Sequence, residues 1–195
     1  MKKFSYQDAV KFHGHSCPGL AMGYRAAAFA LKQFGRDKDE EIFAVVENDS
    51  CSVDAVQALC SCTFGKGNLL FLDRGKQVFT FFARRTGKGL RIYVSPPELS
   101  GAEQKLQKEL SAIKNPTGAQ KRRLHLLREK RIRLVLNAPE KAVLKISRPR
   151  VKLPDMAKIR TSGYCSVCGE RTMETRLLRK RGKPVCLECS GRQSP

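Results

Sequence analysis

The fold class of this chain is decided by residues 69–94, LLFLDRGKQVFTFFARRTGKGLRIYV. Three apolar runs rich in β-branched and aromatic residues predict strands at Leu69–Leu72, Val78–Ala83 and Leu90–Val94. The connections between these runs are short, which is typical of antiparallel neighbours rather than of βαβ units. The stretch therefore predicts an α+β protein with a mixed, antiparallel-rich sheet.

Helical and strand patterns alternate in the residues before this stretch. Apolar spacing and turn residues predict, in order, a helix over 5–12, a helix over 18–35, a strand over 42–47 and a helix over 50–60. The Gly-Lys-Gly-Asn turn at 65–68 lacks the full phosphate-binding pattern, so we interpret it as the entry to a strand. The mixture of elements agrees with an α+β core.

The second half of the chain predicts helices, a linker and a small module. Helical spacing extends over 99–113 and 117–136, and prolines mark residues 147–160 as an extended linker. We therefore predict three parts, namely an α+β domain with a helical extension at 1–146, the linker, and a zinc-finger module at 161–195.

The charge of the chain is strongly positive and unevenly spread. The formal net charge of the 195 residues is +20, and residues 95–195 hold 24 Lys and Arg against 9 Asp and Glu. Such a field attracts polyanions. The basic residues of the helix over 117–136 indicate either a nucleic-acid contact or a solvated helix between domains. They are Lys121, Arg122, Arg123, Arg128, Lys130, Arg131 and Arg133.

Neither a secretory signal nor a membrane span is visible in the sequence. The first 11 residues have no apolar core of a signal peptide, and no apolar run approaches 18 residues. We therefore expect a cytoplasmic protein without membrane contact. In a reducing compartment, the eight cysteines are expected to be metal ligands or reactive thiols rather than disulfides.

Two CxxC pairs near the end of the chain predict a structural zinc site. Cys165 and Cys168 form the first pair, and Cys186 and Cys189 form the second. This spacing is typical of four-cysteine zinc modules, in which each pair offers two sulfurs from one tight turn. A pair of redox dithiols is the alternative. Because the module is too short to bury a stabilising core, we expect zinc to be required for its folding.

A second set of metal-ligand residues lies near the start of the chain. His13, His15 and Cys17 alternate, so an extended segment would place them on one side. Cys51 and Asp54 share one face of the helix over 50–60, and Cys62 follows that helix. Imidazole and thiolate donors cluster at sites for soft or borderline metals. The alternatives are a thiol-reactive site, or cysteines that serve only as small buried hydrophobes.

The same residues belong to blocks that resemble the FmdE family of formylmethanofuran dehydrogenase subunits. The blocks are HGHSCPGLAMGYR at 13–25, ENDSCSVDAVQ at 47–57, CTFGKGN at 62–68 and DRGK at 73–76. Together they extend the resemblance over roughly residues 5–140. Ser61 stands where the pattern has glycine, and Cys60 is additional. The C-terminal module is similar to the zinc fingers of the DksA/TraR group of transcription factors.

The resemblance implies a homodimeric α+β core with a metal or active-site pocket. That pocket would use His13, His15, Cys17, Cys51 and Cys62 as ligands of a second metal of unknown identity, with Cys17, Cys51, His15 and Asp54 as catalytic candidates. It also implies a metal-binding subunit or accessory protein that works with molybdenum or tungsten enzyme subunits, acting on one-carbon compounds. The alternatives are a nucleic-acid-binding regulatory protein and a stand-alone metalloenzyme.

Overall fold

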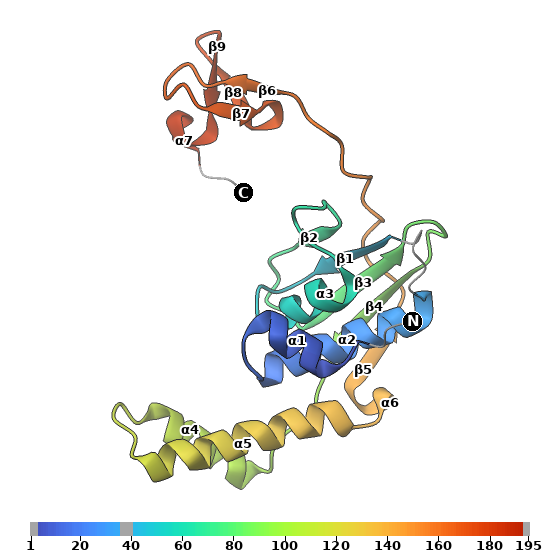
Figure 1. Cartoon of the computed structure of the whole chain (residues 1–195), viewed down its shortest axis with the longest axis vertical. Coiled ribbons are helices and arrows are strands. Elements are labelled where there is room, and N and C mark those ends of the chain that lie inside the picture. Colours follow the sequence, from blue (N-terminus) through green and yellow to red (C-terminus); the bar gives the residue numbers. More distant parts are fainter. Residues whose placement is uncertain (1–3, 36–40, 193–195) are drawn as a thin grey trace. The chain divides into compact units, whose positions relative to one another are not determined.

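The computed structural model describes residues 4–35 and 41–192 (Figure 1). The first three residues of the predicted core domain and the last three of the predicted zinc module lie outside the described residues. The chain divides into two compact units, Met1–Met156 and Ala157–Pro195. Each unit has its own strands and its own apolar cluster.

The first unit contains both the predicted elements and two short elements that the sequence did not indicate. Its helices are α1 (Tyr6–His13), α2 (Pro18–Phe34), α3 (Ser52–Cys60), α4 (Gly101–Ala112), α5 (Gly118–Asn137) and α6 (Glu140–Val143). Its strands are β1 (Ile42–Val46), β2 (Leu69–Phe71), β3 (Val78–Ala83), β4 (Gly89–Val94) and β5 (Leu144–Ser147). Neither α6 nor β5 was predicted, because four residues are too few to show a period. Among the helices described, none has the length and apolar character needed to cross a membrane.

The strands of the first unit form one five-stranded sheet in the order β2-β1-β3-β4-β5. Among these described strands only the β1–β2 pair is parallel, and α3 makes the crossover that a parallel pair requires. The other three pairs are antiparallel. The prediction of an α+β fold with an antiparallel-rich sheet is therefore confirmed.

The two faces of the sheet bury different side chains, because successive residues of a strand point to opposite faces. In β1, Ala44 and Val46 belong to the main core, which α1, α2 and α3 cover from one side (Figure 1). Phe43 and Val45 belong instead to a smaller cluster with Phe82 of β3. Both faces are thus apolar, which explains why β1 is a continuous apolar run rather than an alternating one.

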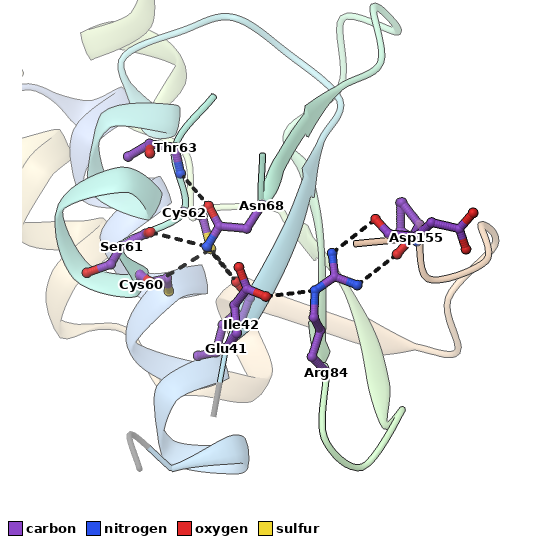
Figure 2. A network of polar contacts seen from close by, with 10 residues as sticks. Glu41, Ile42, Cys60, Ser61, Cys62, Thr63, Asn68, Arg84 and Asp155 are labelled. Carbon is purple, nitrogen blue, oxygen red and sulfur yellow. Dashed lines mark hydrogen bonds and ion pairs between the residues drawn. The ribbon is translucent and has the colours of Figure 1, made fainter. Parts of the chain in front are cut away.

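Part of the predicted linker covers the second face of the sheet. Val151 and Leu153 pack against the smaller cluster. The guanidinium of Arg84 donates to the backbone carbonyl oxygens of Pro154, at 2.9 Å, and of Asp155, at 3.3 Å (Figure 2). The segment that follows β5 is therefore held on the sheet before the chain enters the second unit.

The long helix α5 is attached to the core by one arginine of α2. The Arg25 guanidinium donates to the carbonyl oxygens of Val135, Leu136 and Ala138 at 2.6–2.8 Å. These carbonyls belong to the C-terminal end of α5, where backbone acceptors lack helical partners. Arg25 therefore caps α5 and fixes it against α2.

The second unit is small and has little apolar core. Its elements are β6 (Ser162–Tyr164), β7 (Arg171–Met173), the short 3₁₀ helix η1 (Glu174–Arg176), β8 (Leu177–Lys180), β9 (Lys183–Cys186) and α7 (Leu187–Ser190). The strands form two antiparallel pairs, β6–β7 and β8–β9. Among the described residues of this unit, Val185 is the one buried member of the apolar cluster that is not a cysteine. A core of this size does not stabilise a fold without a metal or a disulfide.

Candidate metal centres

The four cysteines of the second unit converge on one point. The sulfur atoms of Cys165, Cys168, Cys186 and Cys189 all lie within 4.8 Å of one another. The Sγ atoms of Cys168 and Cys186 are 3.9 Å apart. Four sulfurs around one zinc ion at about 2.3 Å would be separated by about 3.8 Å, so the cluster fits a tetrahedral site.

Backbone amides favour the ionised form of the sulfurs in this cluster. Hydrogen bonds from backbone N–H groups, with that of Cys186 first and then those of Cys168 and Val167, lower the pKa of Cys165 to about 6. The pKa of Cys189 is raised to about 12, chiefly by its hydrogen bond with Cys186. Four thiols this close do not all ionise unless a cation neutralises them. The donor set therefore fits Zn²⁺.

A second group of ligand atoms lies where α1, α2 and α3 meet. His13 ends α1, Cys17 precedes α2 and Cys51 precedes α3. One ring nitrogen of His13 and the two sulfurs all lie within 4.8 Å of one another. One imidazole and two thiols form a soft to borderline donor set, which suits zinc, iron, cobalt or nickel.

The two nitrogens of His13 have different partners. Nδ1 lies 2.6 Å from Oδ2 of Asp54, and Nε2 lies 3.9 Å from Sγ of Cys17. Gln57 donates to the other oxygen of Asp54 at 3.1 Å. The carboxylate selects the tautomer with a proton on Nδ1, which leaves the lone pair of Nε2 directed toward the sulfurs. A histidine held by a carboxylate in this way is the usual arrangement behind a metal-bound imidazole.

Both sulfurs lie at the amino ends of helices. Sγ of Cys17 accepts a hydrogen bond from the backbone N–H of Leu20 at 3.3 Å, and the positive end of a helix dipole favours a thiolate. Burial, followed by hydrogen bonding and charge from Cys17, raises the pKa of Cys51. Two negative sulfurs in contact repel each other, so a bound cation would stabilise their ionised forms.

Close backbone contact between α2 and α3 brings the two sulfurs together. A Cβ added at Gly23 would lie 2.0 Å from the carbonyl oxygen of Ser52, so this position accepts only glycine without movement of a helix. A Cβ at Gly19 would lie 3.3 Å from Cβ of Cys51. The buried Asn48 side chain accepts hydrogen bonds from Ser50 and Ser52 and fixes the turn that leads into α3.

Two of the predicted pocket ligands lie outside this three-residue group. His15 is exposed, with its ring centroid 4.4 Å from that of His13. Cys62 is buried below the end of α3, where its Sγ donates to the carbonyl oxygen of Ile42 at 3.1 Å, close to Asn68 (Figure 2). Burial raises the pKa of Cys62 to about 12. Among the residues that the structure describes, Cys62 therefore belongs to the core and not to the metal-ligand group.

The residues that position the site were not indicated by the sequence patterns. Gly23 and Asn48 occur in the blocks that carry the family resemblance, but neither residue type is a metal ligand here. Tyr6 was also missed, although its hydroxyl donates to the carbonyl oxygen of Cys17 at 3.2 Å. A glycine inside a helical pattern was the available signal, because glycine costs helix stability and needs a packing reason.

The fold and the cysteine cluster together define the class of protein. Residues 12–145 match the FmdE family, described as "Molybdenum formylmethanofuran dehydrogenase operon". Residues 160–195 match the prokaryotic dksA/traR C4-type zinc finger. The chain therefore belongs to the FmdE family and carries a C-terminal four-cysteine zinc finger, as the motifs predicted.

Individual relatives support this assignment over nearly the whole chain. A "Probable S-adenosyl-L-methionine-binding protein" of Archaeoglobus fulgidus is 34% identical over 193 residues, which cover 94% of this chain. This chain spans about half of that relative, 51% of its length. A solved structure of an FmdE-like protein of tungsten formylmethanofuran dehydrogenase from Syntrophus aciditrophicus is also similar. Its sequence identity is 25% and its TM-score 0.60, covering 96% of this chain and 93% of that one.

Proposed function

We propose that this protein is a metal-binding accessory protein or subunit, with a functional metal at His13, Cys17 and Cys51. The observation that carries the proposal is the convergence of one imidazole and two thiols from three different helices, with Asp54 bound to the far side of the imidazole. A buried structural cysteine needs no carboxylate-held histidine beside it. The C-terminal zinc, by contrast, has four cysteine ligands and serves the fold of its module.

The donor set leaves room for a ligand from outside the protein. Three protein ligands with a fourth position for water or substrate are typical of catalytic metal sites, whereas four protein ligands are typical of structural ones. His15, whose ring lies beside that of His13, is the protein group closest in kind to a fourth donor. We propose that His15 either completes the coordination or yields its place to a small substrate or a partner's ligand.

The family suggests the setting in which this metal would act. The similar structure bears the name of an FmdE-like protein of a tungsten formylmethanofuran dehydrogenase. On that basis we propose that this chain works beside larger oxidoreductase subunits in one-carbon metabolism and forms a homodimer. Within such an assembly Cys17, Cys51, His15 and Asp54 are the proposed reactive groups.

Element analysis of the full-length protein tests the metal assignment. Wild type should contain two metal ions per chain, one of them the zinc of the C-terminal module. Cys51→Ala should contain one, because a thiolate ligand is lost from a three-ligand site. Cys62→Ala is the matched control and should keep both ions, since Cys62 donates to a backbone carbonyl. A wild-type protein that holds only one ion, and takes up no second zinc, nickel, cobalt or iron on titration, would contradict the proposal.

A further inference from the structure

The tip of the β8–β9 hairpin concentrates positive charge. Residues 179–183 read Arg-Lys-Arg-Gly-Lys, so four of five side chains are cationic, and all five residues are exposed. No Asp or Glu occurs anywhere between Leu177 and Cys186. The tip is therefore a compact cationic surface that the zinc module does not use to hold its metal.

Two features of this tip work against the stability of the hairpin. Lys180 and Lys183 are directly opposite each other in the strand register, and like charges in that position repel. Arg181 has a φ of 51° and is followed by Gly182 with a φ of 78°. Both central residues of the turn thus have positive φ, a conformation in which Asn, Asp or Gly is preferred at the first position. An arginine here is unfavourable for folding, and backbone outliers of this kind concentrate at functional sites.

The hairpin nevertheless holds its tip in a defined conformation. The Arg179 guanidinium donates to the carbonyl oxygen of Gly182 at 2.9 Å, which braces the turn. Strand β9 leads directly into Cys186, and the backbone N–H of Ser166 donates to the carbonyl oxygen of Pro184 at 2.8 Å. The cationic side chains are therefore presented on a ribbon that is anchored at the four-cysteine cluster, so little ordering is needed before binding.

We propose that this hairpin tip binds the phosphate backbone of duplex DNA. Lys and Arg side chains neutralise phosphates, and a two-stranded ribbon fits the major groove of B-form DNA, which is about 12 Å wide. The corresponding groove of duplex RNA is too narrow to admit it. Phosphate contacts position a protein without reading sequence, so binding is independent of base sequence. This activity is separate from the metal site of the first unit and does not depend on it.

The sharpest test is Arg181→Asn in the full-length, zinc-loaded protein. The change removes one cation from the tip and creates the Asn-Gly turn that this backbone prefers. Binding to a labelled DNA duplex is measured by fluorescence anisotropy over a range of salt concentrations. We expect affinity to fall, and the slope of log K against log salt to decrease by about 0.9, the value for one lost phosphate contact. The thermal stability of the module should be unchanged or raised.

A triple variant and a matched control separate the tip from net charge. Lys180→Gln with Arg181→Asn and Lys183→Gln should lower the slope by about 2.7, the value for three contacts. Lys121→Gln with Arg122→Gln and Arg123→Gln removes the same charge from exposed positions of α5 and should leave the slope unchanged. Zinc content verifies that each variant is folded.

Four results would overturn the proposal. The first is an absence of duplex binding by wild type at about 50 mM salt, where such contacts are strong. The second is an unchanged slope in Arg181→Asn. The third is an equal loss in the α5 control, which would mean that only net charge matters. The fourth is equal competition by polyglutamate and by duplex RNA, which would identify an acidic surface of any kind as the partner.

Discussion

At the scale of single residues, His13 shows how one side chain is committed to a metal. Its Nδ1 lies 2.6 Å from Asp54, and its side chain is 11% exposed. The carboxylate holds the ring orientation and makes Nε2 a better donor. Asp54 itself is 35% exposed, so it can be changed without leaving a buried charge unpaired.

Asp54→Asn should therefore weaken metal binding while leaving the fold intact. The amide can still accept from Nδ1, but it carries no charge to strengthen the imidazole as a ligand. We expect the affinity of the N-terminal site to fall about 10- to 100-fold, the range for loss of such a partner. Competition with a chromophoric chelator measures this affinity. Asp49→Asn, at an exposed position in the preceding loop, is the control and should bind as wild type does.

At the scale of elements, the spacing of α2 and α3 decides whether the site exists. The backbones of the two helices meet at Gly23 and Ser52. Because Cys17 and Cys51 precede these two helices, any change in helix spacing also moves the sulfurs. The glycine thus acts on the metal site through the helices that carry the ligands.

Gly23→Ala should destabilise the first unit and also lower its metal affinity. The new methyl group would meet backbone atoms of Ser52, which cannot rotate away as a side chain can. Overpacking of a core costs about 1–3 kcal/mol, and we expect the upper end of that range. Chemical denaturation and metal analysis measure the two effects. Gly101→Ala, where an added Cβ meets nothing within 4 Å, should be neutral in both; a neutral Gly23→Ala would show that the helices can separate freely.

The α4–α5 hairpin depends on a carboxylate that titrates at low pH. Glu103 accepts hydrogen bonds from Lys130 of α5, at 2.6 Å, and from the backbone N–H and hydroxyl of Ser100. The Lys130 contact first, and then those with Ser100, lower the pKa of Glu103 from its ordinary value of 4.5. A carboxyl whose pKa is lower in the folded state stabilises the fold above its unfolded pKa, and this stabilisation disappears as the pH falls through the folded pKa.

Glu103→Gln should accordingly lower the melting temperature slightly near neutral pH and make it less dependent on pH below about 4.5. The exposed Glu109 of the same helix is the control position, and Glu109→Gln should leave the acid side of the curve as in wild type. Circular dichroism melts from about pH 3 to pH 7 provide the comparison, the range in which an ordinary glutamate titrates. Parallel curves for wild type and Glu103→Gln would mean that the contact with Lys130 contributes nothing.

At the scale of the whole molecule, the two units have different sources of stability. The first unit buries a core from three helices and both faces of a sheet. The described part of the second has a single cluster of three buried residues, two of which are cysteines. Its folding therefore depends on the free energy of zinc binding, which is about 10 kcal/mol or more for structural sites.

Cys168→Ser should remove one zinc ion per chain and unfold the second unit alone. Three sulfurs bind zinc more weakly than four, and the apolar cluster of the module is too small to replace the metal. Limited proteolysis should then cut between 157 and 192, while the melting temperature of the first unit stays as in wild type. Ser166→Ala, in the same turn, is the control. Full zinc retention by Cys168→Ser would rule out a four-cysteine structural site.

The sequence alone determined the features that depend on neighbours along the chain. The CxxC spacing specified the zinc cluster, because each pair lies within one turn. Apolar runs specified the strands of the α+β sheet, and the two motif blocks specified the FmdE family. These signals are local, so no knowledge of how helices pack was needed.

Tertiary structure alone decided which of the N-terminal donors meet. Cys17 and Cys51 come together because α2 and α3 touch at Gly23, a contact between segments far apart in sequence. Cys62 was predicted beside them but lies in the core, because Ser61 ends α3 with a φ of 55° and the chain then turns toward β1. Ligand chemistry can be recognised in a sequence, whereas the convergence of ligands depends on backbone packing that no local pattern records.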